Sequence, residues 1–402
     1  MNESRMQRIA AHPFTTALGV FVYLLFRNVL SPLTGNELDV MPVARHAFDN
    51  WLAHDWYLGN SIGYRAAFNT VFGALPGVIG FEATVLFGRT LICALFAVII
   101  ALWGQALRIP PVLTIFAFAV FYNNQSLVAD EWMIKSLETK PFAYLFVLVG
   151  AYLAHRNHFR WSALCFGLAT SMHVLVGGYA TMAALGVFAF HQRLLSLPWS
   201  TVVLFALGAA NLWWVLLRQL GGGFAQEAVE LYVHYRVPHH VDPSVWPSKW
   251  LWAFPGLLLG IIALRNCSRA VADFACVSAL IFSAGLIAWW IEADRLLRYY
   301  PFRLADVVLP LVFTTLVAVK LSEWIRGARS WVPRLAPVVL TLLAAGAIGD
   351  AVWHGAKAVA QGRVVKPPHH GALKALAATQ ELLAPESVLL APPDLDSVYW
   401  VA

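Results

Sequence analysis

The sequence has few charged residues. Asp, Glu, Lys and Arg make up 12% of its 402 residues, about half of the roughly 25% found in soluble domains. Hydrophobic residues make up 59% against about 45–50% in soluble domains, and the mean hydropathy is +0.65. A soluble globule of this size cannot bury so much apolar surface. The composition excludes a soluble enzyme, a disordered chain and a fibrous repeat, and it predicts a polytopic membrane protein.

Cysteine and phosphate-binding motifs are also scarce. The four cysteines have neither metal-ligand spacing nor a shared loop, so a disulfide framework and a zinc site gain no support. The sequence contains no glycine-rich phosphate loop and no convincing Ser-His-Asp order. The net charge of +6 is typical of basic residues in cytoplasmic loops and does not require a nucleic-acid partner.

Long apolar runs are abundant and predict an all-α fold with about eleven transmembrane helices. Some of the runs are short for a full span and are candidates for re-entrant or broken helices. The predicted segments are 14–31, 83–105, 110–122, 141–154, 161–173, 175–190, 200–217, 250–264, 271–291, 303–320 and 335–353.

The distribution of basic residues predicts the orientation. With the N-terminus in the cytoplasm, basic residues far outnumber acids in the cytoplasmic turns, as the positive-inside rule requires. We therefore expect a multi-pass protein of a bacterial inner membrane whose long loops face the periplasm or the cell exterior. The cytoplasmic basic residues are Arg5, Arg8, Arg108, Arg156, Arg160, Arg193, Arg265, Arg269, Lys320, Arg326, Arg329 and Arg334.

The predicted domains are a transmembrane domain over 1–353 and an external tail over 354–402. The strand-like run SVLLAPP near the C-terminus has no partner strand, so we expect residues 370–402 to be the stub of a truncated soluble domain. The alternative is a short external tail. The long loops are all on the external side, where chemistry carried by loops is expected. These external loops are 32–82, 123–140, 218–249 and 292–302.

The first external loop carries Glu37 and Asp39 next to a predicted amphipathic helix on the membrane surface. That helix is expected to begin at Pro42, and Arg45 and Asp49 are spaced to pair along it. Glu37 or Asp39 is a candidate general base or metal ligand, because desolvation at the membrane boundary raises the pKa of a carboxylate. The alternative is a capped surface helix with solvated acids.

The second external loop carries Asp130, Glu131 and Glu138 ahead of Lys140. Two or three carboxylates with water suffice for a divalent cation that also binds a phosphate. Lys140 is a candidate phosphate ligand. The alternative is ordinary charge at a helix end.

His173 lies in a predicted helix junction with Gly177 and Gly178. An ionisable group at membrane depth is costly and is a functional candidate, although a packing histidine is the commoner case. The paired glycines permit close backbone approach or a kink.

Arginines gather at the last external turn. Arg298 and Arg303 are candidates to clamp a lipid phosphate, and Asp306 is spaced to pair with Arg303. The alternative is interfacial snorkelling plus that ion pair. Arg27 and Arg89 lie in apolar segments and require partners that the sequence does not identify.

Four blocks in order, ELDVMPVARHAFD with DWYLGN, LETKPFAYLFVLVGAYLAHR, GLATSMHVLVGGYA and RYYPFRLADVVLPL, resemble an uncharacterised bacterial family related to the GT-C superfamily of integral-membrane glycosyltransferases. The blocks cover most of the chain between about 35 and 320. The resemblance implies a GT-C-like fold and inverting transfer of a sugar from a polyprenyl-phosphate donor on the external face.

The resemblance also implies roles for particular residues. It implies a catalytic acid at Glu37 or Asp39, further acids at Asp130 and Glu131 or at Glu138, and a basic residue near the donor phosphate. The candidates for that basic residue are Lys140, Arg298 and Arg303. The expected cofactor is a divalent cation, magnesium or manganese, held by Asp130, Glu131 and Glu138, and His173 is a further candidate for substrate binding. The first loop departs from the family in having Glu-Leu-Asp where an Asp-x-Asp or Asp-Glu pair is usual.

Two other functions remain open. One is a transporter, flippase or lipid-binding protein without covalent chemistry, which would use charges on several central helices. The other is a noncatalytic assembly partner. The bilayer and a lipid-linked sugar are the expected partners of the enzyme.

Overall fold

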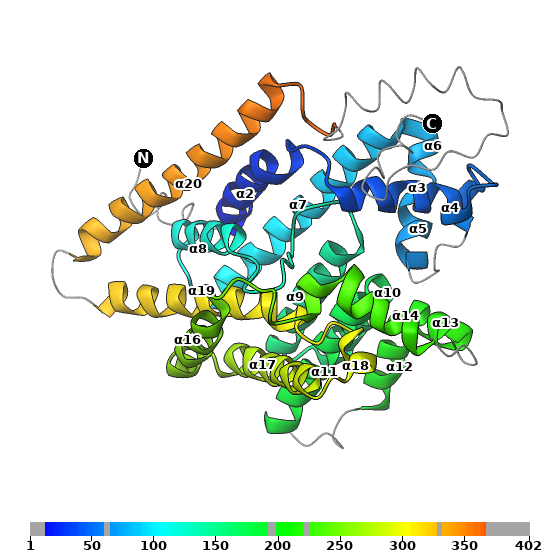
Figure 1. Cartoon of the computed structure of the whole chain (residues 1–402). Helices are drawn as coiled ribbons and strands as arrows, with labels where there is room; N and C mark the ends of the chain where they lie inside the picture. Colours follow the sequence, from blue (N-terminus) through cyan, green and yellow to red (C-terminus); the bar gives the residue numbers. More distant parts are fainter. Residues whose placement is uncertain (1–12, 60–64, 192–197, 220–224, 328–331, 367–402) are drawn as a thin grey trace.

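The computed structural model describes residues 13–59, 65–191, 198–219, 225–327 and 332–366. Every regular element within these ranges is a helix. This confirms the all-α class and is the architecture expected of a helical membrane protein (Figure 1).

Each predicted apolar segment forms a helix, and α19 and α20 extend beyond their expected ends. The helices are α2 (Pro13–Leu24) continued by η1 (Leu25–Val29), α7 (Phe81–Ala106), α8 (Pro111–Asn123), α9 (Thr139–His155), α10 (Phe159–Met172), α11 (Val174–His191), α12 (Trp199–Gly208) followed by α13 (Ala210–Gln219), α16 (Trp250–Ala263), α17 (Arg269–Trp290), α19 (Arg303–Gly327) and α20 (Val332–Ala360).

The number of spans differs from the expectation of eleven. Five described helices are long and apolar enough to cross a membrane: α7, α11, α17, α19 and α20. A sixth is reached if α12 and α13, which are bent by 68°, form one broken span. Helices such as α16, with 14 residues, are about 21 Å long at 1.5 Å per residue, short of a hydrocarbon core of about 30 Å. The prediction of eleven spans is therefore wrong by length, although the positions of the helices were right.

The long helices pack side by side in two neighbouring groups. α10 contacts α9, α11 and α12, and α17 packs against α19 and α11. α2 lies against α7 and α8, and α20 runs along the rim of the molecule beside α2, η1 and α8 (Figure 1). Short helices lie in the loops that were predicted to be external. They are α3 (Gly35–Asp49), α4 (Trp56–Gly59), α5 (Ala66–Phe72), α6 (Leu75–Ile79), α14 (Gln226–Leu231), η4 (Tyr232–Arg236), α15 (Pro238–Val241) and α18 (Asp294–Leu297).

The helix in the loop 32–82 begins earlier than expected. Thr34 and Glu37 form a reciprocal capping box that starts α3 at Gly35, so Pro42 lies inside the helix. Most of its first ten residues are buried, including Leu38 and Met41. The first part of α3 therefore packs against the rest of the protein, and Arg45 and Asp49 pair along the helix at 3.7 Å, as predicted.

The described part of the C-terminal region returns to the start of the loop 32–82. α20 continues past the predicted boundary at 353 to Ala360. The backbone then pairs with the first loop through Val365 N–H to Ser31 O at 3.0 Å and Leu33 N–H to Lys366 O at 3.1 Å. The remainder of the predicted tail, 367–402, including the expected strand, lies outside the described residues.

Candidate functional site

The loop between α8 and α9 is folded around one buried carboxylate. Asp306, in the first turn of α19, is 0% exposed and accepts hydrogen bonds from the loop. Its expected ion pair with Arg303 is absent among the described contacts, because the loop donors surround the carboxylate instead. The donors are Ser126 Oγ at 2.9 Å and the backbone N–H groups of Leu127 at 2.7 Å, Val128 at 2.5 Å, Ala129 at 3.1 Å and Glu131 at 3.2 Å.

We expect Asp306→Asn to destabilise this loop by about 1–3 kcal/mol or more. An amide NH₂ in place of one oxygen turns a donor toward backbone donors and leaves buried N–H groups unsatisfied. The measurement is hydrogen exchange of residues 126–131 in the purified protein, which should become faster. Asp350→Asn is the control, since that side chain is 52% exposed. Unchanged exchange in Asp306→Asn would contradict the anchoring role.

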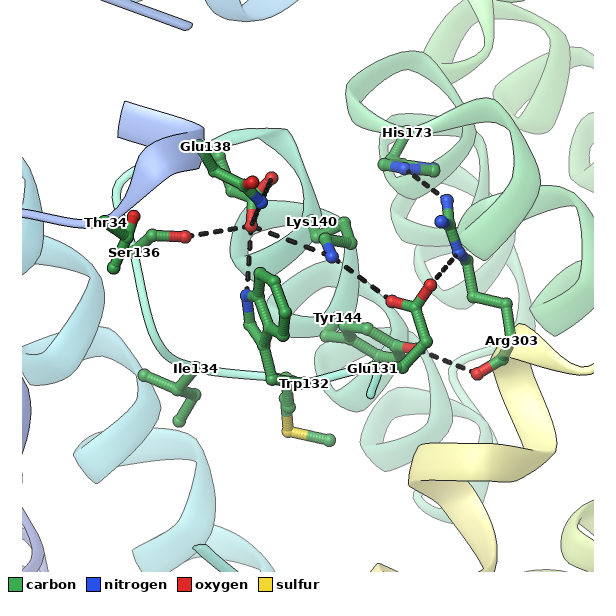
Figure 2. A network of polar contacts seen from close by, with 12 residues as sticks. Thr34, Glu131, Trp132, Ile134, Ser136, Glu138, Lys140, Tyr144, His173 and Arg303 are labelled. Atoms are coloured by element: carbon green, nitrogen blue, oxygen red, sulfur yellow. Dashed lines mark hydrogen bonds and ion pairs between the residues drawn. The ribbon is translucent and has the colours of Figure 1, made fainter. Parts of the chain in front are cut away.

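Four buried side chains and the half-buried His173 form a continuous polar cluster across the loop between α8 and α9, the start of α9, α19 and the turn between α10 and α11 (Figure 2). Lys140 Nζ lies 3.2 Å from Glu131 Oε2 and 3.8 Å from Glu138 Oε1. Arg303 donates from Nε to Glu131 Oε1 at 2.6 Å and contacts His173 Nε2 from Nη1 at 3.0 Å. Glu131, Glu138, Lys140, His173 and Arg303 are called the polar cluster below.

The polar cluster is electrically balanced. Two cations, Lys140 and Arg303, face two carboxylates, Glu131 and Glu138. Burial raises the pKa of Glu131, but Arg303, Lys140 and His240 outweigh it and lower the pKa to about 2. Arg303 has no acceptor atom, so His173 Nε2 accepts and the ring is neutral. A phosphate can bind here only if Lys140 or Arg303 leaves its carboxylate partner and contacts the phosphate instead.

The turn that carries His173 depends on a close helix approach. A Cβ on Gly177 would lie 2.1 Å from the backbone nitrogen of Thr170, whereas one on Gly178 would meet open space. α11 therefore folds tightly onto α10 and holds His173 between them. The predicted close backbone approach is confirmed at Gly177.

His240 links the 218–249 loop to the cluster. Its Nδ1 lies 2.7 Å from Ala129 O and 3.7 Å from Glu131 Oε1, and its ring packs against Tyr300. Burial lowers the pKa of His240 to about 4; Arg303 and His239 act in the same direction, while Glu131 opposes them.

This shift predicts a dependence of stability on pH. Between pH 6.5 and about 4 the unfolded chain binds a proton at His240 that the folded chain does not, so stability falls as the pH is lowered through this window. We expect His240→Gln to remove this component in thermal unfolding measured from pH 7 to pH 4. The exposed His158 provides the control His158→Gln. Equal pH profiles for the wild type and His240→Gln would contradict the prediction.

Glu37 has a structural environment. It is 0% exposed and forms a buried ion pair with Arg89 of α7, with Nε at 2.6 Å and Nη2 at 2.5 Å. It also caps α3 through the backbone N–H of Thr34 and accepts the N–H of Leu137 at 2.6 Å. Because both oxygens are occupied by donors, the geometry gives no support to Glu37 as a general base.

Asp39 and Arg298 also lie outside the polar cluster. Asp39 pairs with Arg65 at 2.8 Å and accepts from the Tyr57 hydroxyl. Arg298 lies 4.7 Å from the centre of the Tyr299 ring and donates to the Tyr299 hydroxyl. These contacts occupy both groups without joining them to Glu131.

The predicted metal ligands do not converge. Within the described ranges, no group of three or more His, Cys, Asp or Glu side chains is arranged to hold a metal ion. Glu131 and Glu138 face Lys140, and Glu138 also accepts from Trp132 Nε1 at 3.0 Å and Ser136 Oγ at 2.8 Å. The expected magnesium or manganese ion therefore gains no support from this arrangement.

Asp130 differs from the neighbouring acids. Its side chain is exposed, and its carboxylate has no hydrogen bond or ion pair with any residue that the structure describes. Its backbone has a φ of 51°, in the left-handed region that is unusual for a non-glycine residue. The segment anchored on Asp306 immediately precedes it. Asp130 is thus held in a strained position with its carboxylate available.

Two cavities lie on either side of the segment 130–133. A cavity of about 600 Å³ extends between α9, α10, α11 and α17 and is lined almost wholly by apolar side chains such as Val147, Phe166, Phe188 and Phe274. A second cavity, of about 730 Å³, has many more polar residues in its walls and is lined by residues of 122–135 and 239–249 together with Arg27, Ser31 and Thr34; it is called the polar cavity below. Both volumes lie within the about 300–1,000 Å³ typical of ligand sites.

The wall between the cavities is the segment 130–133. Asp130, Glu131 and Trp132 line the polar cavity, whereas Met133, with Tyr144, lines the apolar one. The carbonyl oxygen of the Gln125 side chain secures the wall by accepting the N–H groups of Met133 at 2.8 Å and Ile134 at 3.0 Å. The two cavities therefore share this segment, and Glu131 is the member of the polar cluster that lines one of them.

Of the predicted site residues, Glu131, Glu138, Lys140, His173 and Arg303 come together, and Asp130 adjoins them. The role of Asp306 as the anchor of the loop could not be predicted from the sequence. Most of the groups that donate hydrogen bonds to Asp306 are backbone N–H groups, which every residue except proline carries. The ion pair between Arg89 and Glu37 could not be predicted either. The spacing Thr34-x-x-Glu37 indicates a capping box at a helix start, but it does not identify Arg89 as a partner. Comparison with models of known protein families, with curated proteins and with solved structures found no match.

Proposed function

We propose that the protein is a GT-C-like membrane glycosyltransferase. It transfers a sugar from a polyprenyl-phosphate donor to an acceptor on the external face of a bacterial inner membrane, with the N-terminus in the cytoplasm. One observation carries this proposal: the segment 130–133 lines a polar cavity through Asp130 and Glu131 and an apolar cavity through Met133, and Glu131 is paired with Arg303 and Lys140. An amphipathic donor needs this combination, since its tail and its head require different environments.

The donor tail would occupy the apolar cavity, with its phosphate near Tyr144 and the polar cluster. Arg303 and Lys140 are the cations available there. Lys140 is the more easily exchanged, because its contacts are 3.2 and 3.8 Å long whereas Arg303 holds Glu131 at 2.6 Å. An ammonium group that moves from Glu138 to the phosphate would supply charge where the leaving group develops it.

Asp130 is the base that the geometry favours, in place of Glu37. It would take the proton of the acceptor hydroxyl while the acceptor oxygen attacks the anomeric carbon. The bond between the anomeric carbon and the phosphate oxygen breaks, and its electron pair leaves with the polyprenyl phosphate. The single displacement inverts the anomeric configuration. In this step Asp130 takes the proton, and Lys140 provides the positive charge at the leaving phosphate.

The second candidate function is lipid binding or transport without covalent chemistry. The apolar cavity favours it, because its lining continues from Tyr144 past Phe166 to His155 and His191 at the other end of the helices. A lipid could therefore be held or moved without bond cleavage.

The test uses the full chain in proteoliposomes with a short polyprenyl-phosphate hexose labelled in the sugar. We expect the label to leave the lipid and appear in a water-soluble product with inverted configuration. Movement of intact labelled lipid between leaflets, with no cleavage, would support the transport function and contradict the enzyme.

A further inference from the structure

The polar cavity contains cations that the proposed transfer does not use. Arg27 comes from η1, Lys135 from the loop after α8, and Lys249 from the turn before α16. Three segments far apart in sequence thus bring positive charge to one cavity. On the same walls, Asp130 and Glu131 are the acids.

These cations are weakly neutralised. Lys249 has no ion pair among the described residues, and Lys135 Nζ lies over the Trp132 ring at 4.2 Å from its centre. Arg27 donates to Asn123 at 3.0 Å and approaches Asp350 only to 3.9 Å.

The acids on the same walls do not balance them. Glu131 is already paired with Arg303 and Lys140, so Asp130 is the remaining acid against three cations. The cavity carries a surplus of positive charge.

The two tryptophans of the cavity do not offer stacking faces for a neutral sugar. The Trp132 ring has the ammonium groups of Lys140 and Lys135 over it, at 3.8 and 4.2 Å from its centre. Trp246 is 6% exposed and packs against Phe282 and Phe302. Recognition in this cavity therefore depends on charge and hydrogen bonds, because the stacking that commonly binds neutral sugars is blocked at both tryptophans.

We propose that the polar cavity is the acceptor site and that the acceptor is a small anionic molecule with a free hydroxyl. Its carboxylate or phosphate contacts Lys135 and Lys249, and its hydroxyl faces Asp130. The assignment of this molecule as an acceptor rests on the proposed transferase function. The preference of the cavity for an anion rests on the charges of the cavity alone. Complementary charge supplies discrimination between an anion and a neutral molecule of the same shape.

The experiment measures binding to the full chain in nanodiscs without any donor. The probes are methyl glucoside, methyl glucuronide and methyl glucoside 6-phosphate, which share a ring and differ in charge. We expect at least one anionic probe to bind about tenfold tighter than the glucoside, equivalent to one or two partly buried ion pairs, and to weaken with added salt.

The variant is Lys135→Gln/Lys249→Gln, which removes both charges and leaves polar side chains one heavy atom shorter than lysine. It should bind the three probes equally. Lys357→Gln, an exposed lysine on α20, is the matched control and should bind as the wild type does. The proposal is overturned if all probes bind equally to the wild type, if none binds, or if the double variant keeps the preference.

This result is separable from the fate of the proposed function. Anion preference without donor cleavage would leave an anion site in a protein that is not a transferase. Donor cleavage without anion preference would leave the transferase and remove the assignment of its acceptor.

Discussion

Replacing Glu37 with Gln is expected to lower the free energy of unfolding by about 3–5 kcal/mol, because it leaves Arg89 as a buried cation without its carboxylate. Arg89 is 0% exposed and also donates to the backbone oxygens of Asn28, Ser31 and Pro32. The pair thus ties the end of η1 and the start of α3 to α7. The measurement is thermal unfolding of the purified protein in detergent.

Two further variants separate the buried pair from general surface effects. Asp49→Asn removes the partner of Arg45 in an ion pair whose side chains are 25% and 41% exposed, and should cost about 1 kcal/mol or less. Glu37→Leu/Arg89→Met removes both buried charges and should recover part of the stability lost in Glu37→Gln. A Glu37→Gln protein with unchanged stability and no transfer activity would instead make Glu37 the base and contradict its structural role.

Replacing Asp130 with Asn is expected to lower kcat for sugar transfer by about 10²–10⁴-fold, the usual contribution of a positioned general base. The amide keeps the size of the side chain but cannot take the acceptor proton. Because Asp130 is exposed and has no partner among the described residues, its replacement should leave the unfolding temperature unchanged. A loss of kcat without a loss of stability separates Asp130 from the buried acids.

Glu292→Gln is the matched control for Asp130→Asn. Glu292 is also an exposed acid with a positive φ, 54°, in the turn between α17 and α18, and it lies outside both cavities. Asp39→Asn tests the other acid predicted to be catalytic. Full activity in Asp130→Asn together with a loss in Asp39→Asn would move the base to the first loop and contradict the assignment to Asp130.

The sequence predicted which helices form more accurately than how far they reach. Apolar runs such as 83–105 and 271–291 were long enough to identify α7 and α17 closely, because a lipid-exposed or buried helix must be apolar over its length. The run at 200–217 reads equally well as one helix, but it breaks at Ala209 and bends by 68°. A bend set by packing against other helices leaves little trace in composition.

The sequence predicted which residues form the candidate site, but it predicted only some of the contacts between them. Glu131, Lys140 and Arg303 were identified because charges beside long apolar runs are few and costly. Asp306 was expected to pair with Arg303, three residues before it on the same helix. It accepts hydrogen bonds from the loop at Leu127 and Val128 instead. Local spacing predicts contacts along one helix, and it carries no information about a loop almost 180 residues away.

The sequence by itself determined that this is an all-helical chain suited to a membrane, since too few polar residues exist to cover a soluble surface of this size. It also determined that the acids gather in the loops between the apolar runs. Only the tertiary structure decided which acids are neutralised and which is available: Glu37 is paired with Arg89 and Glu131 with Arg303, while Asp130 borders an open cavity. The reason is physical, because the state of a carboxylate depends on burial and on donors brought to it from distant segments.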